Sequence, residues 1–409
     1  MPDYIVDAGR ELPFILILLA LLGLRWRVSP RVSLFIAAPA EKVFALLDFQ
    51  EGESQHWQRT RVTAHLVDAA TRTYRLSFVT PLATGAVVSS DALFRVTRRE
   101  APTLLEVDRA GLDGKSDNNE LLKIQASFTP QRGGTRLNLA YHWGPRPLLA
   151  QLLARTDLWG SVYRLKGMAE TGVPDYRGDR LISAGVALVT GIVTLATFAF
   201  AFGPGVAILL VGALLFHEFG HLLAFRLIGQ PWGRMVFLPF LGAVAVPRLA
   251  FATQAQSVFA ALMGPAFSIA IPLAIALFLW SGTGRAEIIA PIGIVVAALN
   301  LFNLLPVEPL DGGVVLRSVL ASVMGAYARF GLIAVGAVII VAGFAFKLVL
   351  LMIFGGLAVV ANIRPRTIDA GLEQLSFLQV TISAFGFVAV VAAYAALLPY
   401  LLAHALPGT

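Results

Sequence analysis

The chain has 409 residues, of which 57% are hydrophobic and 14% are charged, and this balance excludes an ordinary soluble protein. The formal net charge of +7 comes largely from arginines beside apolar segments, which indicates orientation in a membrane rather than nucleic-acid binding. Cysteine is absent, so any metal must bind to imidazole and carboxylate groups.

Residues 1–28 are predicted to form an N-terminal transmembrane anchor. They contain the apolar run LPFILILLALLGL, followed by arginines. A cleaved signal peptide would have a basic start and a small-residue cleavage site, and neither is evident. The arginines after the run place the next segment in the cytoplasm. The arginine-rich and alanine-rich composition favours a bacterial inner membrane.

Residues 29–172 are predicted to form a soluble α+β domain. Alternating segments such as RVSLFIAA, TYRLSFV, DALFRVTR and TRLNLAYHW indicate strands, and the helix PAEKVFALLDF follows the first of them. A longer helix, RPLLAQLLARTDLWGSVYRLKGMAE, closes the segment and predicts a sheet wrapped on a helix. This order, with IAAPAEKVFALL and GGTRLNLAYHW, resembles the START-like or polyketide-cyclase family of helix-grip domains. The resemblance implies a cavity for an apolar ligand.

Residues 173–180 form a predicted linker, and residues 181–409 are predicted to be a polytopic membrane domain. About 20 apolar residues suffice to cross the hydrocarbon core. The expected spans are 181–202, 205–227, 257–280, 288–305, 330–362 and 376–403, the fifth long enough for two short helices broken near Lys347. The Gly- and Pro-punctuated segment 234–248 is too short to cross and predicts a re-entrant hairpin.

The stretch HEFGH places ionisable side chains inside one of these spans. His217 and His221 are four residues apart, so they share one helical face and can present imidazole nitrogens to a single metal. Glu218 points about 100° around the helix and is placed to act on a water instead. The alternative is that the three groups bond to neighbouring helices. Burying ionisable side chains in a membrane costs several kcal/mol unless they are paired or coordinated, which favours a metal.

A catalytic zinc site needs three protein ligands and an open position. The segment NLFNLLPVEPLDGG offers two further carboxylates at the end of an apolar span. Asp311 stands in a Pro-broken turn beside Gly312 and Gly313, where its side chain can be aimed inward. Glu308 lies between prolines and is the competing ligand.

The two motifs together resemble the site-2 protease family, whose signature pairs HExxH with a downstream NxxPxxxLDG. The second motif is matched here by Asn303, Pro306, Leu310, Asp311 and Gly312. The resemblance implies that His217, His221 and Asp311 bind zinc, that Glu218 is the catalytic base and that Asn303 is a polar group near the scissile carbonyl. The stretch GPAFS, residues 264–268, fits the family's small-residue motif and fits ordinary helix packing equally well.

The sequence therefore predicts a polytopic α-helical membrane protein with a metalloprotease core and an N-terminal START-like domain. The expected activity is zinc-dependent hydrolysis of peptide bonds in transmembrane or membrane-associated proteins, with a transmembrane substrate protein and membrane lipid as partners and no nucleic acid. One alternative is a membrane-anchored, ligand-sensing regulatory protein with a non-catalytic metal site. The other, a transporter or channel, would need inverted repeats and further buried charges.

Overall fold

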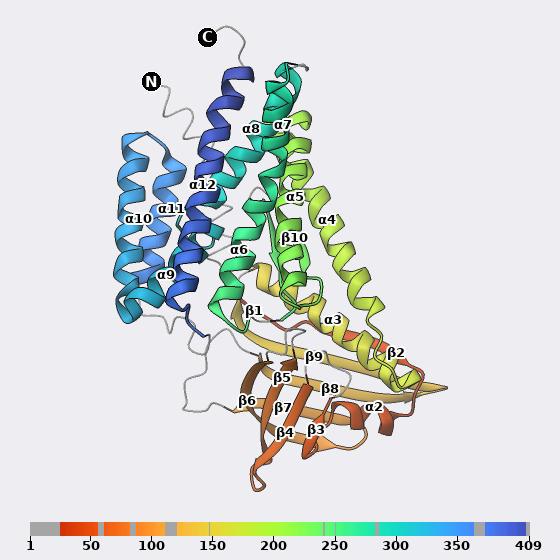
Figure 1. Cartoon of the computed structure of the whole chain (residues 1–409). Helices are drawn as coiled ribbons and strands as arrows, with labels where there is room; N and C mark the ends of the chain where they lie inside the picture. Colours follow the sequence, from red (N-terminus) through yellow and green to blue (C-terminus); the bar gives the residue numbers. More distant parts are fainter. Residues whose placement is uncertain are drawn as a thin grey trace, which may run out of the picture. The chain divides into compact units, whose positions relative to one another are not determined.

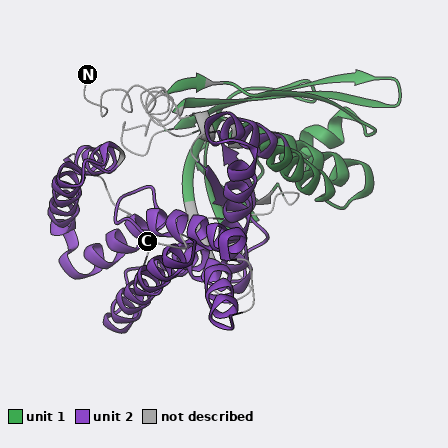
Figure 2. Ribbon diagram, turned by 90° about the horizontal axis from the view of Figure 1, so that it is seen from above, with its two compact units in different colours: residues 1–188 green, residues 189–409 purple. Residues whose placement is uncertain are grey.

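The computed structural model describes residues 25–55, 61–81, 87–110, 121–146, 148–239, 242–249, 251–282, 286–363 and 373–405. The apolar run 12–24 of the predicted anchor lies outside these residues. The chain divides into two compact units, Met1–Leu188 and Val189–Thr409, which Figure 2 colours separately.

The first unit contains an antiparallel sheet with the strand order β1-β9-β8-β7-β6-β5-β4-β3, and β2 also pairs with β9 (Figure 1). The strands are β1 Trp26–Val28, β2 Arg31–Ile36, β3 Gly52–Ser54, β4 Arg61–Asp68, β5 Thr73–Pro81, β6 Val87–Glu100, β7 Leu104–Ala110, β8 Leu121–Gln131 and β9 Gly134–Arg146. Two helices accompany the sheet, α2 Ala40–Leu47 and α3 Leu148–Thr171. The predicted α+β arrangement, helix-grip-like in its element order, is confirmed.

Helix α3 packs on the sheet through one apolar face. Leu158, Val162, Leu165 and Ala169 are spaced at helical periodicity, and all four are buried in the same core as the inward residues of the sheet. The sheet residues of this core alternate along each strand, as a half-buried antiparallel sheet requires. These four buried side chains hold α3 against the sheet.

Helix α4, Arg177–Phe202, begins inside the segment that the sequence predicts to be a linker. Its first turn is held by α3, because Arg164 Nη1 lies 2.5 Å from Asp179 Oδ2 and both side chains are buried. The Asp179 side chain packs against Gly160 of α3, where a Cβ would overlap the Asp179 carboxylate. This buried ion pair joins the start of α4 to α3, and both belong to the first unit, Met1–Leu188.

Removing one partner of this ion pair is expected to be strongly destabilising. Asp179→Ala leaves the Arg164 guanidinium buried without its carboxylate, which costs about 3–5 kcal/mol. The matched control is Glu100→Ala, whose exposed pair with Arg98 is worth about 0–1 kcal/mol. Thermal unfolding of the detergent-purified variants measures both losses. Equal losses in the two variants would contradict the expectation.

In its described residues the second unit consists of helices and one two-stranded hairpin, joined by loops (Figure 1). After α4 come α5 Pro204–Leu227, β10 Arg234–Leu238, β11 Gly242–Val246, α6 Gln254–Ser268, α7 Ala270–Trp280, α8 Ala286–Asn303, α9 Asp311–Met324, the 3-10 turn Gly325–Tyr327, α10 Ala328–Ala345, α11 Val349–Ile363 and α12 Phe377–Ala405. Within the described residues, six helical segments are long and apolar enough to cross a membrane. The prediction of a multi-pass membrane protein is thus confirmed.

The finer predictions for this unit also match the structure. The long fifth apolar run is interrupted at Lys347, whose φ is +57°, so α10 and α11 form two helices there. The segment 234–248 forms the antiparallel hairpin β10–β11, in which Arg234 pairs with Val246 and Leu238 with Gly242. Gly242 opens β11 with a φ of +118°, a conformation that favours glycine.

Candidate metal centre

The HEFGH stretch lies in the second half of α5. This helix starts at Pro204, whose ring suits a first helical position, and continues without a break to Leu227. His217, Glu218 and His221 are only 2%, 3% and 8% exposed. Three ionisable side chains are therefore buried within two turns of one apolar helix, which requires compensation by partners.

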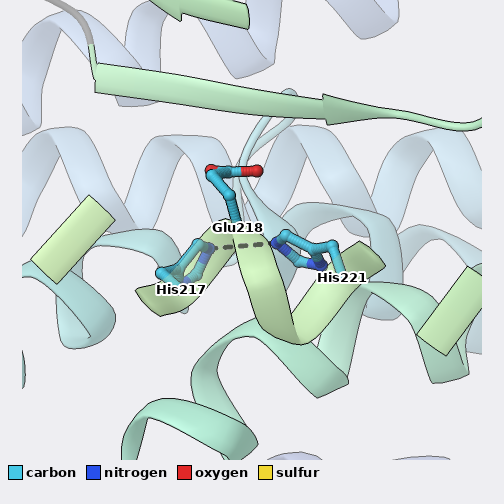
Figure 3. A group of neighbouring side chains, drawn as sticks. All are labelled: His217, Glu218 and His221. Carbon is cyan, nitrogen blue, oxygen red and sulfur yellow. Dashed lines mark hydrogen bonds between the residues drawn. The ribbon is translucent and has the colours of Figure 1, made fainter. Parts of the chain in front are cut away.

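The two histidines meet Asp311 through the same ring nitrogens. His217 Nε2 and His221 Nε2 are 3.0 Å apart, and Figure 3 shows the two rings facing each other. Asp311, the first residue of α9, places Oδ2 3.2 Å from His217 Nε2 and 3.5 Å from His221 Nε2. Residues almost a hundred positions apart in the sequence thus converge on one point.

These three atoms have the spacing of ligands around a zinc ion. Tetrahedral coordination at the bond lengths usual for imidazole and carboxylate, roughly 2.0–2.1 Å, puts neighbouring ligand atoms about 3.3 Å apart. The separations of 3.0, 3.2 and 3.5 Å cluster around that value. Two neutral nitrogens and one carboxylate also form a donor set that zinc accepts, so the residues present fit the ion.

Glu218 is also close to this cluster. Ligand atoms of His217, Glu218 and His221 all lie within 4.8 Å of one another. However, Figure 3 shows the Glu218 carboxylate directed away from the facing imidazole rings. Its carboxylate accepts a hydrogen bond from the Ala245 backbone of β11, and its Oε2 is buried without a partner among the described residues. Strand β11 thus holds this carboxylate through one hydrogen bond and leaves its Oε2 without a partner among the described residues.

The second motif forms the end of α8 and the start of α9. Glu308, the competing ligand, forms an ion pair with Arg317, with Oε1 2.9 Å from Nη1, whereas Asp311 turns to the histidines. Gly312 and Gly313 pack on the backbone of the preceding loop, since a Cβ on either would lie within 2.3 Å of its main-chain atoms. Asn303 is half-buried at the last residue of α8.

The small-residue stretch on α6 packs directly on the site. A Cβ added to Gly264 would lie 2.4 Å from His221 Nε2 and 3.0 Å from His217 Cε1. Gly220 of α5 lies directly against Gly264, because a Cβ on Gly220 would lie 3.0 Å from the Gly264 Cα. The absence of side chains at this crossing is what lets the two helices approach and leaves room beside the imidazoles.

Gly264→Val is therefore expected to reduce metal affinity by displacing the ring of His221. The expected loss is at least about tenfold, comparable to disturbing other groups that orient a ligand. Isothermal titration of the metal-free protein with zinc measures it. Gly356→Val on α11 is the control, since a Cβ there meets nothing within 4 Å. Unchanged affinity in Gly264→Val would contradict this account of the crossing.

Two buried residues that the motifs do not mark complete the surroundings. Asn300 Oδ1 lies 2.8 Å from His217 Nδ1, and the Tyr394 hydroxyl donates to the Pro265 carbonyl at 2.7 Å, which fixes α12 against α6. Asn300 is a polar residue within an apolar span, one turn before Asn303, and this was the signal that the sequence offered. The sequence around Tyr394 contains no comparable signal of a contact with the site.

Comparisons with known proteins give structural resemblance only. No family model matches the chain, and no curated protein matches it. The solved structures similar to it include the site-2 protease from Methanocaldococcus jannaschii, with 19% identity, a TM-score of 0.31, and coverage of 45% of this chain and 92% of that one.

Two others are START-like proteins. An AHSA1-like protein from Aeromonas hydrophila has 14% identity, a TM-score of 0.25, and coverage of 34% of this chain and 90% of that one. The di-domain ARO/CYC BexL has 16% identity, a TM-score of 0.27, and coverage of 41% of this chain and 58% of that one. With TM-scores below 0.5 for all three, the chemistry of the site has to be judged from its own side chains.

Proposed function

We propose that this protein is a zinc-dependent intramembrane endopeptidase that cleaves transmembrane or membrane-associated proteins. The observation that carries the proposal is the convergence of His217 Nε2, His221 Nε2 and Asp311 Oδ2 at zinc-ligand spacing, with the unpartnered carboxylate oxygen of Glu218 beside them. A purely structural site would be closed by a fourth ligand and would need no such base.

The chain's own residues supply the remaining chemistry. Bound zinc would polarise a peptide carbonyl and lower the pKa of water toward about 7. Glu218 removes a proton from the attacking water and delivers it to the leaving amine, while the Ala245 N–H holds its carboxylate. Asn303 is proposed to hydrogen-bond the substrate near the scissile carbonyl.

The hairpin offers a place for an unwound substrate segment. The Phe237 N–H donates to Thr190 Oγ1 at 3.1 Å, so this group faces away from β11. In an antiparallel pair the residue opposite, Ala243, and then Ala245, also turn their backbone groups outward. In the described residues this hairpin has only two strands, so the edge of β11 at Ala243 is proposed to pair with a substrate strand, beside the Ala245 N–H that is already bonded to Glu218.

The partners and location follow as further parts of the proposal. The substrate is a transmembrane protein, membrane lipid surrounds the second unit, and the START-like unit faces the cytoplasm of a bacterial cell. An apolar ligand of that unit is a further proposal, which rests on the resemblance of its element order to helix-grip domains.

The proposed function is tested with the detergent-purified, full-length chain and a model single-span substrate protein. About one zinc per chain by elemental analysis, cleavage that stops after removal of the metal by a chelator, and recovery on adding zinc are the expected results. Zinc binding without any cleavage would favour the regulatory alternative, and a wild-type protein that binds no zinc would overturn the proposal.

A further inference from the structure

Asn300 is a buried polar residue that stands outside both motifs. It lies on α8, is fully buried, and has its side-chain Oδ1 2.8 Å from His217 Nδ1. Its Nδ2 donates to the Val296 carbonyl, also at 2.8 Å. Both ends of the amide are therefore committed to partners inside the helical unit.

These two contacts determine which nitrogen of His217 carries the proton. The Val296 carbonyl can only accept, so the NH2 group of the amide must face it. The oxygen must then face His217, and since this oxygen can only accept, Nδ1 of His217 must be protonated. In the neutral ring Nε2 then keeps its lone pair, and Nε2 is the atom that points to Asp311.

His221 is held in the same tautomer by a different kind of group. Its Nδ1 lies 2.7 Å from the backbone carbonyl of Ala260 on α6. A main-chain carbonyl is present whatever the side chain at that position. The orientation of His221 is thus a property of the fold, whereas that of His217 depends on one side chain that substitution can remove.

We propose that Asn300 is the positioning residue for His217, fixing its tautomer and ring orientation so that Nε2 is ready to bind the metal. The inference rests on the proposed function, because it takes His217 to be a ligand. Helix α8 then serves the site twice: it orients one ligand through Asn300, and its C-terminal end leads into the loop that delivers Asp311.

The test is cobalt(II) binding by the metal-free, full-length protein, followed by visible absorption and by competition with a chelator. Asn300→Leu removes the acceptor and keeps the branched shape of the side chain, although its methyl groups are larger, and it is expected to weaken binding about 10–100-fold and to alter the cobalt spectrum. Asn300→Ala also removes the acceptor, and because its side chain is smaller it adds no group that has to fit between the helices. Asn300→Asp keeps an oxygen beside His217 and is expected to bind more tightly than either.

Asn362→Leu is the matched control, because Asn362 on α11 makes the same bond to the carbonyl four residues earlier, Nδ2 to Ala358 at 2.8 Å. It should bind cobalt like the wild type. If the leucine and alanine variants also bind with wild-type affinity and spectrum while the wild type cleaves its substrate, this inference is wrong and the protease remains. A wild type without metal would overturn both.

Discussion

Glu218→Gln is expected to abolish cleavage of a transmembrane substrate while leaving the bound zinc in place. The amide has nearly the shape of the carboxylate but cannot accept the proton of the attacking water. Loss of a general base costs about 10²–10⁴ in rate. The ligands His217, His221 and Asp311 are untouched, so metal content should stay near that of the wild type. Single-turnover cleavage and elemental analysis of the same sample measure the two quantities.

The control for this variant is Glu287→Gln, an exposed carboxylate in the first turn of α8. It should cleave at the wild-type rate. Normal cleavage by Glu218→Gln would remove the base from the mechanism. Loss of both the zinc and the cleavage activity would instead make Glu218 a ligand, since its carboxylate lies within 4.8 Å of ligand atoms of both histidines.

Asp311→Ala is expected to lose both metal and activity. It removes the only carboxylate oxygen found within 3.5 Å of both histidine Nε2 atoms in the described part of the chain. Loss of an outer partner already costs about 10–100-fold in affinity, so loss of a direct ligand should exceed that. Zinc titration of the metal-free variant measures the change.

Glu308→Ala distinguishes the two carboxylates of the second motif. Because Glu308 pairs with Arg317, its removal should leave zinc affinity close to that of the wild type. Should Glu308→Ala lose the metal and Asp311→Ala retain it, the third ligand has been assigned to the wrong residue.

Much of the fold could be predicted because solvent imposes simple patterns on this sequence. Alternation of apolar and polar residues predicted the strands of the first unit, and long apolar runs predicted the spans of the second. The break near Lys347 and the hairpin at 234–248 were also predictable, since each interrupts an apolar pattern that lipid would otherwise continue. The start of α4 at Arg177 could not be predicted in this way, because its first turn is polar and is held against α3 by the buried Asp179, a contact that the apolar pattern does not encode.

The sequence by itself predicted that the two histidines face one metal and that Glu218 is the base, because HExxH spacing on a helix places the two imidazoles on one face. It also favoured Asp311 over Glu308 as the third ligand, on grounds that included the family resemblance. Only the tertiary structure shows that Asp311 lies beside the histidines and that Glu308 pairs with Arg317, since the direction of a side chain in a Pro-broken loop depends on what packs around it. In the same way, Asn300, Gly264 and the Ala260 carbonyl acquire their relation to the histidines only when α6 and α8 pack against α5. Periodicity encodes which face of a helix is buried, whereas contact between helices distant in sequence is set by the packing of the whole unit.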